Sequence, residues 1–153
     1  MKVYYWSPFI SHVATVTAVI NSIISIKKFS TIKADYRVIN VFKEWSPYDI
    51  ELKKNKIQCV DLGTFLNINF LPKFGFLKSR FTYILTYIFS IIKLHKFLKK
   101  EKPEFLIIHL ISSIPLSLLL FFKYETKFIL RISGYPKMTV FRKTLWKLCD
   151  SKL

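Results

Sequence analysis

Apolar and polar residues alternate along the chain in blocks whose periods predict strands and helices. Residues 2–9 (KVYYWSPF) are apolar and aromatic up to Ser7 and Pro8, a pattern typical of a buried strand. Residues 12–26 then place apolar side chains three and four positions apart, which puts one stripe on one face of a helix. Ser11 precedes this helix, and its hydroxyl can accept a hydrogen bond from an amide of the first turn. The chain is therefore expected to begin with a strand that runs directly into a helix.

Four further apolar runs predict four further strands. They cover residues 36–42 (YRVINVF), 57–62 (IQCVDL), 105–111 (FLIIHLI) and 127–132 (KFILRI). The stretch 43–55 (KEWSPYDIELKKN) between the first two of these runs is predicted to be a polar loop. Gly63 is expected to end the second run.

The longest predicted helix covers residues 79–100. Its polar positions recur in steps of three and four, which traces one narrow polar stripe along an otherwise buried helix. The stripe consists of Thr82, Thr86, Ser90, Lys93, Lys96 and Lys100. Pro103 ends this helix, and two more helices are expected, a short one from Pro115 and a final one from about Val140.

The order of these elements predicts the fold class. Strands that alternate with helices are typical of an α/β domain, Rossmann-like, with a doubly wound parallel sheet that helices cover on both faces. A membrane-spanning alternative exists for residues 105–122, an uncharged run of 18 residues. His109, Ser112 and Pro115 lie inside this run and would be costly in a lipid-facing helix, so a strand, a turn and a short helix are favoured.

Composition and charge narrow the classes of protein. With 52% hydrophobic residues and three glycines in 153 residues, the chain is expected to be one globular domain. A net charge of +16 is compatible with nucleic acid, but only four basic residues are arginines, which base recognition favours. We therefore expect no nucleic acid and instead a cytoplasmic, peripheral position on an anionic membrane surface. Cys59 and Cys149 are expected to be buried free thiols in a reducing compartment.

The three histidines are the most informative reactive side chains. Their spacing matches no metal site, and none of the common phosphate-binding, protease or hydrolase motifs is present. His95 is expected to be a solvated surface residue among lysines. His109 is either a core histidine or a functional residue near the carboxyl end of its strand. His12, in the first turn of the first helix, leaves a functional role and an exposed structural role equally open.

The few carboxylates give no catalytic assignment. Glu44 and Glu51 lie in the predicted polar loop and are expected to be solvated. Asp61 follows a strand and is expected to form a turn. We therefore assign no catalytic acid or base from spacing.

The carboxyl ends of the predicted strands carry small hydroxyl groups. Ligands of open parallel sheets bind outside these ends. Here the ends carry residues 7–12, 61–64, 109–113 and 133–136. The first and last of these loops combine serines with the amides of helix starts, which favours a polyhydroxyl or anionic ligand.

Two segments resemble a known family. Residues 131–148 (RISGYPKMTVFRKTLWKL) combine a strand, an S-G-x-P turn and a helix with R and W, and residues 102–109 (KPEFLIIH) lie upstream. Together they resemble the N-terminal half of glycosyltransferase family 4 enzymes, which have the GT-B fold. Residues 7–22 (SPFISHVATVTAVINS) look like the first loop and helix of the subgroup that builds surface polysaccharides. The resemblance covers essentially the whole chain.

The resemblance implies acceptor-side roles for residues of the first and last loops. These residues are Ser7, Ser11, His12, Ser133, Gly134 and Arg142, the last of them reaching an anionic group. His109 is added because of its place near a strand end. The first loop lacks the Gly-Gly pair that is common in the family, which favours an acceptor saccharide or lipid-linked head group there over a dinucleotide.

The resemblance also implies an activity that needs a second domain. In the family, the nucleotide-sugar site and its E-x₇-E signature lie in a C-terminal domain, and this sequence stops before it. Residues 1–153 would then be the N-terminal acceptor-binding domain, inactive alone, with the donor domain on a longer chain or a separate subunit. The implied reaction transfers a sugar from a nucleotide-sugar to a saccharide or lipid-linked acceptor in cell-envelope polysaccharide biosynthesis, without cofactor or metal. A non-catalytic basic module at a membrane surface and a small integral membrane protein stay open as alternatives.

Overall fold

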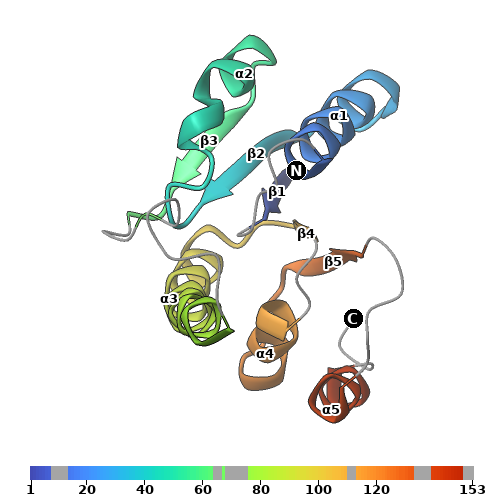
Figure 1. Cartoon of the computed structure of the whole chain (residues 1–153). Helices are drawn as coiled ribbons and strands as arrows, with labels where there is room; N and C mark the ends of the chain where they lie inside the picture. Colours follow the sequence, from blue (N-terminus) through green and yellow to red (C-terminus); the bar gives the residue numbers. More distant parts are fainter. Residues whose placement is uncertain (8–13, 64–66, 68–75, 110–112, 133–138, 150–153) are drawn as a thin grey trace.

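The computed structural model describes residues 1–7, 14–63, 67, 76–109, 113–132 and 139–149. In this part of the chain five parallel strands form one sheet in the order β3-β2-β1-β4-β5 (Figure 1). The strands are β1 (Lys2–Trp6), β2 (Asp35–Asn40), β3 (Gln58–Asp61), β4 (Phe105–His109) and β5 (Lys127–Arg131). The helices are α1 (Ala14–Phe29), α2 (Asp49–Lys54), α3 (Phe76–Glu101), α4 (Ser113–Phe121) and α5 (Val140–Cys149), with a 3-10 turn at Ser46–Tyr48 before α2. The predicted α/β class with a doubly wound, Rossmann-like parallel sheet is confirmed.

Helices cover both faces of the sheet, and each face has its own apolar core (Figure 1). Successive strand residues point to opposite faces, so β1 divides its side chains between the two cores. Val3 and Tyr5 pack with residues of α1 and α2, whereas Tyr4 and Trp6 pack with residues of α3, α4 and α5. Because strands buried on both faces need apolar residues at every position, they appear in the sequence as continuous apolar runs.

The segment 43–55 is not the polar loop that its composition predicts. It contains the 3-10 turn and α2, whose Leu52 is buried in the core on the α1 side. Glu44, predicted to be solvated, is 2% exposed and accepts hydrogen bonds from the amides of Val41 and Phe42. Burial raises the pKa of the Glu44 carboxyl to about 7, although these amide donors act to lower it.

The sequence predicts that the polar stripe of α3 faces outward, but in the first half of the helix the stripe faces the core. The buried members of the predicted polar stripe are Thr82, Thr86 and Ser90. These side chains are small, and the Thr86 hydroxyl donates to the Thr82 carbonyl of its own helix, whereas Ser90 Oγ has no partner among the described residues. Two tyrosines of α3 reach α4, where the Tyr83 and Tyr87 hydroxyls hydrogen-bond to Ser113 and Ser117. The outward side of this half of the helix is therefore apolar.

Residues 105–122 do not form a membrane-spanning helix. Their described parts are β4, which is paired on both sides within the sheet, and α4, a helix of 9 residues. Every residue of α4 from Ser113 to Leu119 is buried in the domain. The spanning alternative for this run is therefore wrong.

The structure confirms the prediction for Asp61 and corrects those for His95 and Cys59. Asp61 forms the predicted turn, because its Oδ1 accepts a hydrogen bond from the Gly63 amide at 2.7 Å. His95 is not simply solvated, since it is half-buried and its Nδ1 lies 2.8 Å from the Tyr124 hydroxyl. Both cysteines are free, but Cys59 is half-buried rather than buried.

Candidate functional site

The strand order of the sheet reverses between β1 and β4. The chain leaves β1 across the face covered by α1, and it leaves β4 across the face covered by α4. In open α/β sheets ligands bind at such a position, outside the carboxyl ends of the two strands. Trp6 and Ile108 form the last pair between β1 and β4, and Ser7 and His109 follow them. We refer to this position as the switch point.

Ser7 and His109 are buried at the switch point. Ser7 is 1% exposed and His109 is 4% exposed. Within the described part of the chain, neither Ser7 Oγ nor His109 Nε2 has a hydrogen-bond partner. A buried polar group without a partner costs about 1–3 kcal/mol, and such groups are rare in native proteins. Among the described residues, the other buried side-chain atoms without a partner are Trp6 Nε1, Trp45 Nε1, Ser90 Oγ and Trp146 Nε1. Ser7 and His109 differ from these because they come directly after the last β1–β4 pair, where parallel sheets bind ligands, so they form a candidate ligand position.

The surroundings of His109 keep its ring neutral. Its ring centroid lies 6.0 Å from that of Tyr5, whose hydroxyl is itself partnered by Ser22 Oγ at 3.1 Å. Burial, with a smaller contribution from the positive charge of Arg131, lowers the pKa of His109 to about 4. At neutral pH the imidazole therefore has one nitrogen that donates and one that accepts. Nε2 can meet a ligand hydroxyl in either role.

Arg131 adds a positive charge beside the switch point. It is paired with His109 in the register of β4 and β5, and it is exposed. A guanidinium at this place favours a ligand that carries an anionic group as well as hydroxyls. Sequence reasoning did not select Arg131. Its position at the end of the last predicted strand, next to the strand that bears His109, was the signal that could have found it.

The structure places two residues of the predicted site and leaves the rest undescribed. Ser7 and His109 lie on neighbouring strands at the switch point. The predicted residues that lie outside the described part are Ser11, His12, Ser133 and Gly134. The backbone of Arg142 belongs to the first turn of α5, and its side chain is also outside the described part. The roles of all these residues stay predictions.

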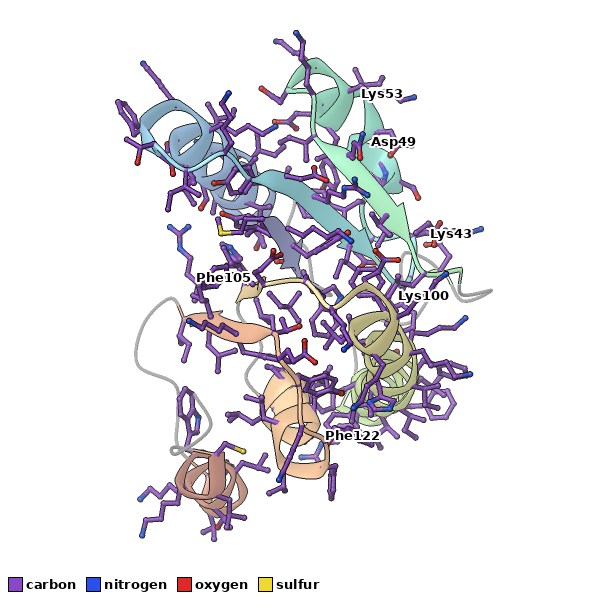
Figure 2. The ribbon with its side chains drawn as sticks, turned by 180° about the vertical axis from the view of Figure 1, so that it is seen from behind. Lys43, Asp49, Lys53, Lys100, Phe105 and Phe122 are labelled. Atoms are coloured by element: carbon purple, nitrogen blue, oxygen red, sulfur yellow. The ribbon has the colours of Figure 1, made fainter. Side chains whose placement is uncertain are left out.

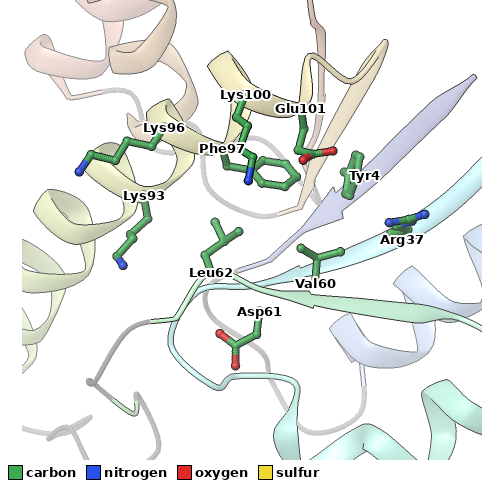
Figure 3. A pocket seen from close by; sticks show the side chains of 10 residues that line it. All are labelled: Tyr4, Arg37, Val60, Asp61, Leu62, Lys93, Lys96, Phe97, Lys100 and Glu101. Atoms are coloured by element: carbon green, nitrogen blue, oxygen red, sulfur yellow. The ribbon is translucent and has the colours of Figure 1, made fainter.

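A cavity of about 400 Å³ lies between α3 and the strands β1, β2 and β3 (Figure 3). Its charged lining consists of Arg37, Lys93, Lys96, Lys100, Asp61 and Glu101. Arg37 is already paired with Asp35 at 2.6 Å, and Lys93 Nζ donates to the Gly63 carbonyl at 2.9 Å. The lysine spacing on α3 was visible in the sequence, but nothing in it showed that strands β2 and β3 face these lysines. Because cations and carboxylates share the walls, the switch point is the more specific candidate.

Comparisons with known proteins leave the family unassigned. No family model matches the chain, and no curated protein is similar to it. Among solved structures, the chain is similar to a UDP-GlcNAc 2-epimerase from Neisseria meningitidis bound to UDP-GlcNAc. The identity is 18%, the TM-score is 0.45, and the match covers 78% of this chain and 28% of the epimerase chain. This likeness is too weak to carry an argument about function, so the resemblance to family 4 glycosyltransferases stays a prediction. The described residues hold no group of three or more His, Cys, Asp or Glu side chains that could bind a metal ion.

Proposed function

We propose that this chain is the acceptor-binding domain of a glycosyltransferase that transfers a sugar from a nucleotide-sugar to a saccharide or lipid-linked acceptor. The observation that carries the proposal is the pair of buried groups without partners, Ser7 Oγ and His109 Nε2, at the switch point. The hydroxyl groups of a saccharide both donate and accept, so one sugar ring can satisfy both groups. An apolar ligand would leave both unpaired.

The charge beside the switch point supports an acceptor with a phosphate group. In the proposed transfer, an acceptor hydroxyl oxygen forms a bond to the anomeric carbon while the bond from that carbon to the nucleoside diphosphate breaks. The hydroxyl proton passes to the departing diphosphate. Arg131 is exposed next to His109 and would stabilise either a lipid-linked diphosphate or the departing diphosphate. His109 has the role of holding the acceptor hydroxyl in this proposal, and no catalytic base is assigned.

The remaining parts of the proposal come from the resemblance of the sequence. The residues that would complete the acceptor site are Ser11, His12, Ser133, Gly134 and Arg142. A second domain, on a longer chain or on a separate subunit, would bind the nucleotide-sugar. The 153-residue chain is therefore expected to bind an acceptor without turning over a donor.

Saturation-transfer NMR tests the proposal directly. The 153-residue chain is titrated with neutral oligosaccharides and with an isoprenoid-diphosphate-linked sugar, and binding of at least one of these ligands is expected. Ser7→Ala and His109→Phe each remove one of the two groups and are expected to weaken binding by about tenfold. The matched control is Ser90→Ala, which removes another buried hydroxyl without a partner, but on α3, and leaves the affinity unchanged.

Three outcomes count against the proposal. Unchanged affinity in both switch-point variants would show that the two groups do not contact the ligand. A folded chain that binds no saccharide at all contradicts the acceptor role. Turnover of a sugar nucleotide by the 153-residue chain alone contradicts the need for a second domain.

A further inference from the structure

The outward side of α3 is apolar although it is exposed. Phe81, Ile84, Ile88 and Ile92 are 59%, 53%, 48% and 46% exposed. Their steps of three, four and four place them on one side of the helix, and we call these four residues the α3 apolar stripe. Figure 2 shows side chains extending from α3 on the side away from α4. A helix that lies between a soluble core and water normally shows the opposite arrangement, with its polar residues outward.

The apolar stripe continues into lysines along the same side of the helix. Lys96 and Lys99 follow Ile92 in steps of four and three, and both are exposed. One side of α3 is therefore apolar from Phe81 to Ile92 and basic towards its end. The whole chain adds to this charge, because 25 lysines and arginines face only 9 acidic residues.

We propose that the α3 apolar stripe docks the chain on an anionic lipid bilayer, with α3 lying in the plane of the interface. The stripe enters the boundary of the acyl chains, while Lys96 and Lys99 meet the phosphates of the head groups. Charge decides between the possible occupants of this face. A second copy of the chain would bring another net charge of +16 against the first, whereas an anionic lipid surface is complementary to it.

Docking on the surface fits α3 better than crossing the bilayer. Among the described residues, Arg80–Glu101 is long and apolar enough to cross a membrane by length and composition, with a mean hydropathy of 1.2. However, its other side is committed to the domain, because Leu94, Phe97 and Leu98 are buried in the core beneath the sheet. A spanning helix would have to leave that core and carry its lysines into the bilayer. The in-plane arrangement requires neither.

The position of the stripe gives docking a geometric consequence. α3 connects the carboxyl end of β3 to the amino end of β4, so it runs antiparallel to the strands and its first half lies towards their carboxyl ends. The stripe covers residues 81–92, around the middle of the helix. With α3 in the plane of the interface, the strands would therefore run along the lipid surface, and the switch point would lie beside that surface rather than face it. The docking itself does not depend on the proposed sugar transfer, although a lipid-linked acceptor would be reached from this position.

Vesicle flotation tests the docking with the 153-residue chain. We expect the chain to float with vesicles of phosphatidylcholine containing about a third phosphatidylglycerol, and to stay behind with phosphatidylcholine alone. The double variant Ile84→Glu, Ile88→Glu is expected to lose at least about tenfold in partitioning. The matched control Ile50→Glu changes a residue of α2 that is 85% exposed and is expected to partition as the unmodified chain does.

A second pair of variants separates the two lysines at the end of α3 from the net charge of the chain. Lys96→Glu with Lys99→Glu is expected to weaken partitioning by roughly fivefold or more for each lysine, because each lysine near an anionic surface contributes about that factor. Lys53→Glu with Lys54→Glu makes the same change of net charge on α2 and is expected to have a clearly smaller effect. Circular dichroism of each variant checks that it is folded.

Four results would overturn the docking proposal. The first is a folded chain that binds neither vesicle. The second is a stripe variant that floats as well as the unmodified chain. The third is a dimer that the stripe variant dissociates, in the absence of vesicle binding, which would make this face a contact between copies. The fourth is retention in the membrane after alkaline carbonate extraction, which would make α3 a spanning helix.

Discussion

Buried polar side chains lie at two places along the carboxyl edge of the sheet, the turn after β2 and the switch point. In the turn after β2, the Glu44 carboxylate and the Asn40 side-chain oxygen have hydrogen-bond partners within the protein. After β2, the carboxylate of Glu44 accepts hydrogen bonds from the amides of Val41 and Phe42. The side-chain oxygen of Asn40 accepts another from the Trp45 amide at 3.2 Å. These polar groups pair with the backbone around them, so the turn after β2 has a structural explanation.

The switch point has the same burial but lacks such pairing. Ser7 Oγ and His109 Nε2 have no partner within the described residues, whereas Glu44, equally buried, is paired with backbone amides. The comparison shows that a buried polar residue does not by itself mark a ligand site. A missing partner alone does not mark one either, because Ser90 Oγ and Trp45 Nε1 are also buried without a partner among the described residues. Ser7 and His109 combine the missing partner with a place at the switch point, where parallel sheets bind their ligands.

The largest effect is expected in the turn after β2. Glu44→Ala leaves the amides of Val41 and Phe42 buried without an acceptor and should lower the free energy of unfolding by about 3 kcal/mol. Urea denaturation measures this loss. Glu51→Ala, on the exposed side of α2, is the control and should change stability by less than about 0.5 kcal/mol. A similar small effect of both variants would contradict the structural role of Glu44.

The pH dependence of stability should separate the two positions next. The pKa of Glu44 is raised to about 7 in the folded chain, so its contribution to stability falls as the pH rises from 4.5 to 7. The pKa of His109 is lowered to about 4, so its contribution falls as the pH drops from 6.5 to 4. The two contributions therefore have opposite slopes between pH 4.5 and 6.5 and offset one another in the unmodified chain.

Single variants should reveal each slope. In His109→Phe, the stability relative to the unmodified chain should decline as the pH rises through this window, by about 1.4 kcal/mol per pH unit. In Glu44→Gln, the relative stability should instead increase with pH at a similar rate. Urea denaturation at several pH values gives both differences. Curves parallel to that of the unmodified chain would show that neither pKa is shifted by folding.

Ser7→Ala should have a smaller effect of the opposite sign to Glu44→Ala. Removing a buried hydroxyl that has no partner removes a desolvation cost, so the free energy of unfolding should rise by about 1 kcal/mol. Thermal denaturation should show a melting temperature about 2–4 °C higher. If Ser7→Ala gains stability and loses saccharide binding, Ser7 is a functional residue that lowers the stability of the fold. A loss of stability would show that the hydroxyl has a partner after all.

The smallest effect is expected at Tyr5, a residue of β1 two positions before Ser7. Tyr5→Phe removes a hydroxyl that is paired with Ser22 Oγ at 3.1 Å, so stability should fall by about 0.5–1 kcal/mol. The loss stays small because Ser22 is half-buried and can bind water instead. If Tyr5→Phe stabilised the chain as Ser7→Ala does, the distinction between partnered and unpartnered hydroxyls would fail.

Much of the fold could be predicted because burial on both faces leaves a simple pattern. The apolar runs marked the strands of the described sheet, and the segments between β1 and β2 and between β3 and β4 had helical spacing. Helix α2 was missed because it has only 6 residues, of which Leu52 alone is buried, so no period is visible. The orientation of α3 was missed because apolar residues lie on both of its sides, and spacing does not tell which side meets the sheet.

The candidate site was predictable in position but not in pairing. The rule for parallel sheets placed Ser7 and His109 at strand ends, which the structure shows. Whether a polar group has a partner depends on where its neighbours' atoms lie, and the sequence does not contain this information. The burial of Glu44 was missed for the same reason, because the sequence does not show that the backbone amides before it point at its carboxylate.

The ring nitrogens of His109 give the most direct test of the central claim that the switch point holds a hydroxyl-rich ligand. Nitrogen-15 chemical shifts of the imidazole are followed at pH 7 while the saccharide found by saturation transfer is added. We expect a change at His109 Nε2 that saturates with ligand and is the same in Ser90→Ala. We expect no change at the ring nitrogens of His95. His109 nitrogens that stay unchanged at saturating saccharide would show that the ligand does not bind at the switch point.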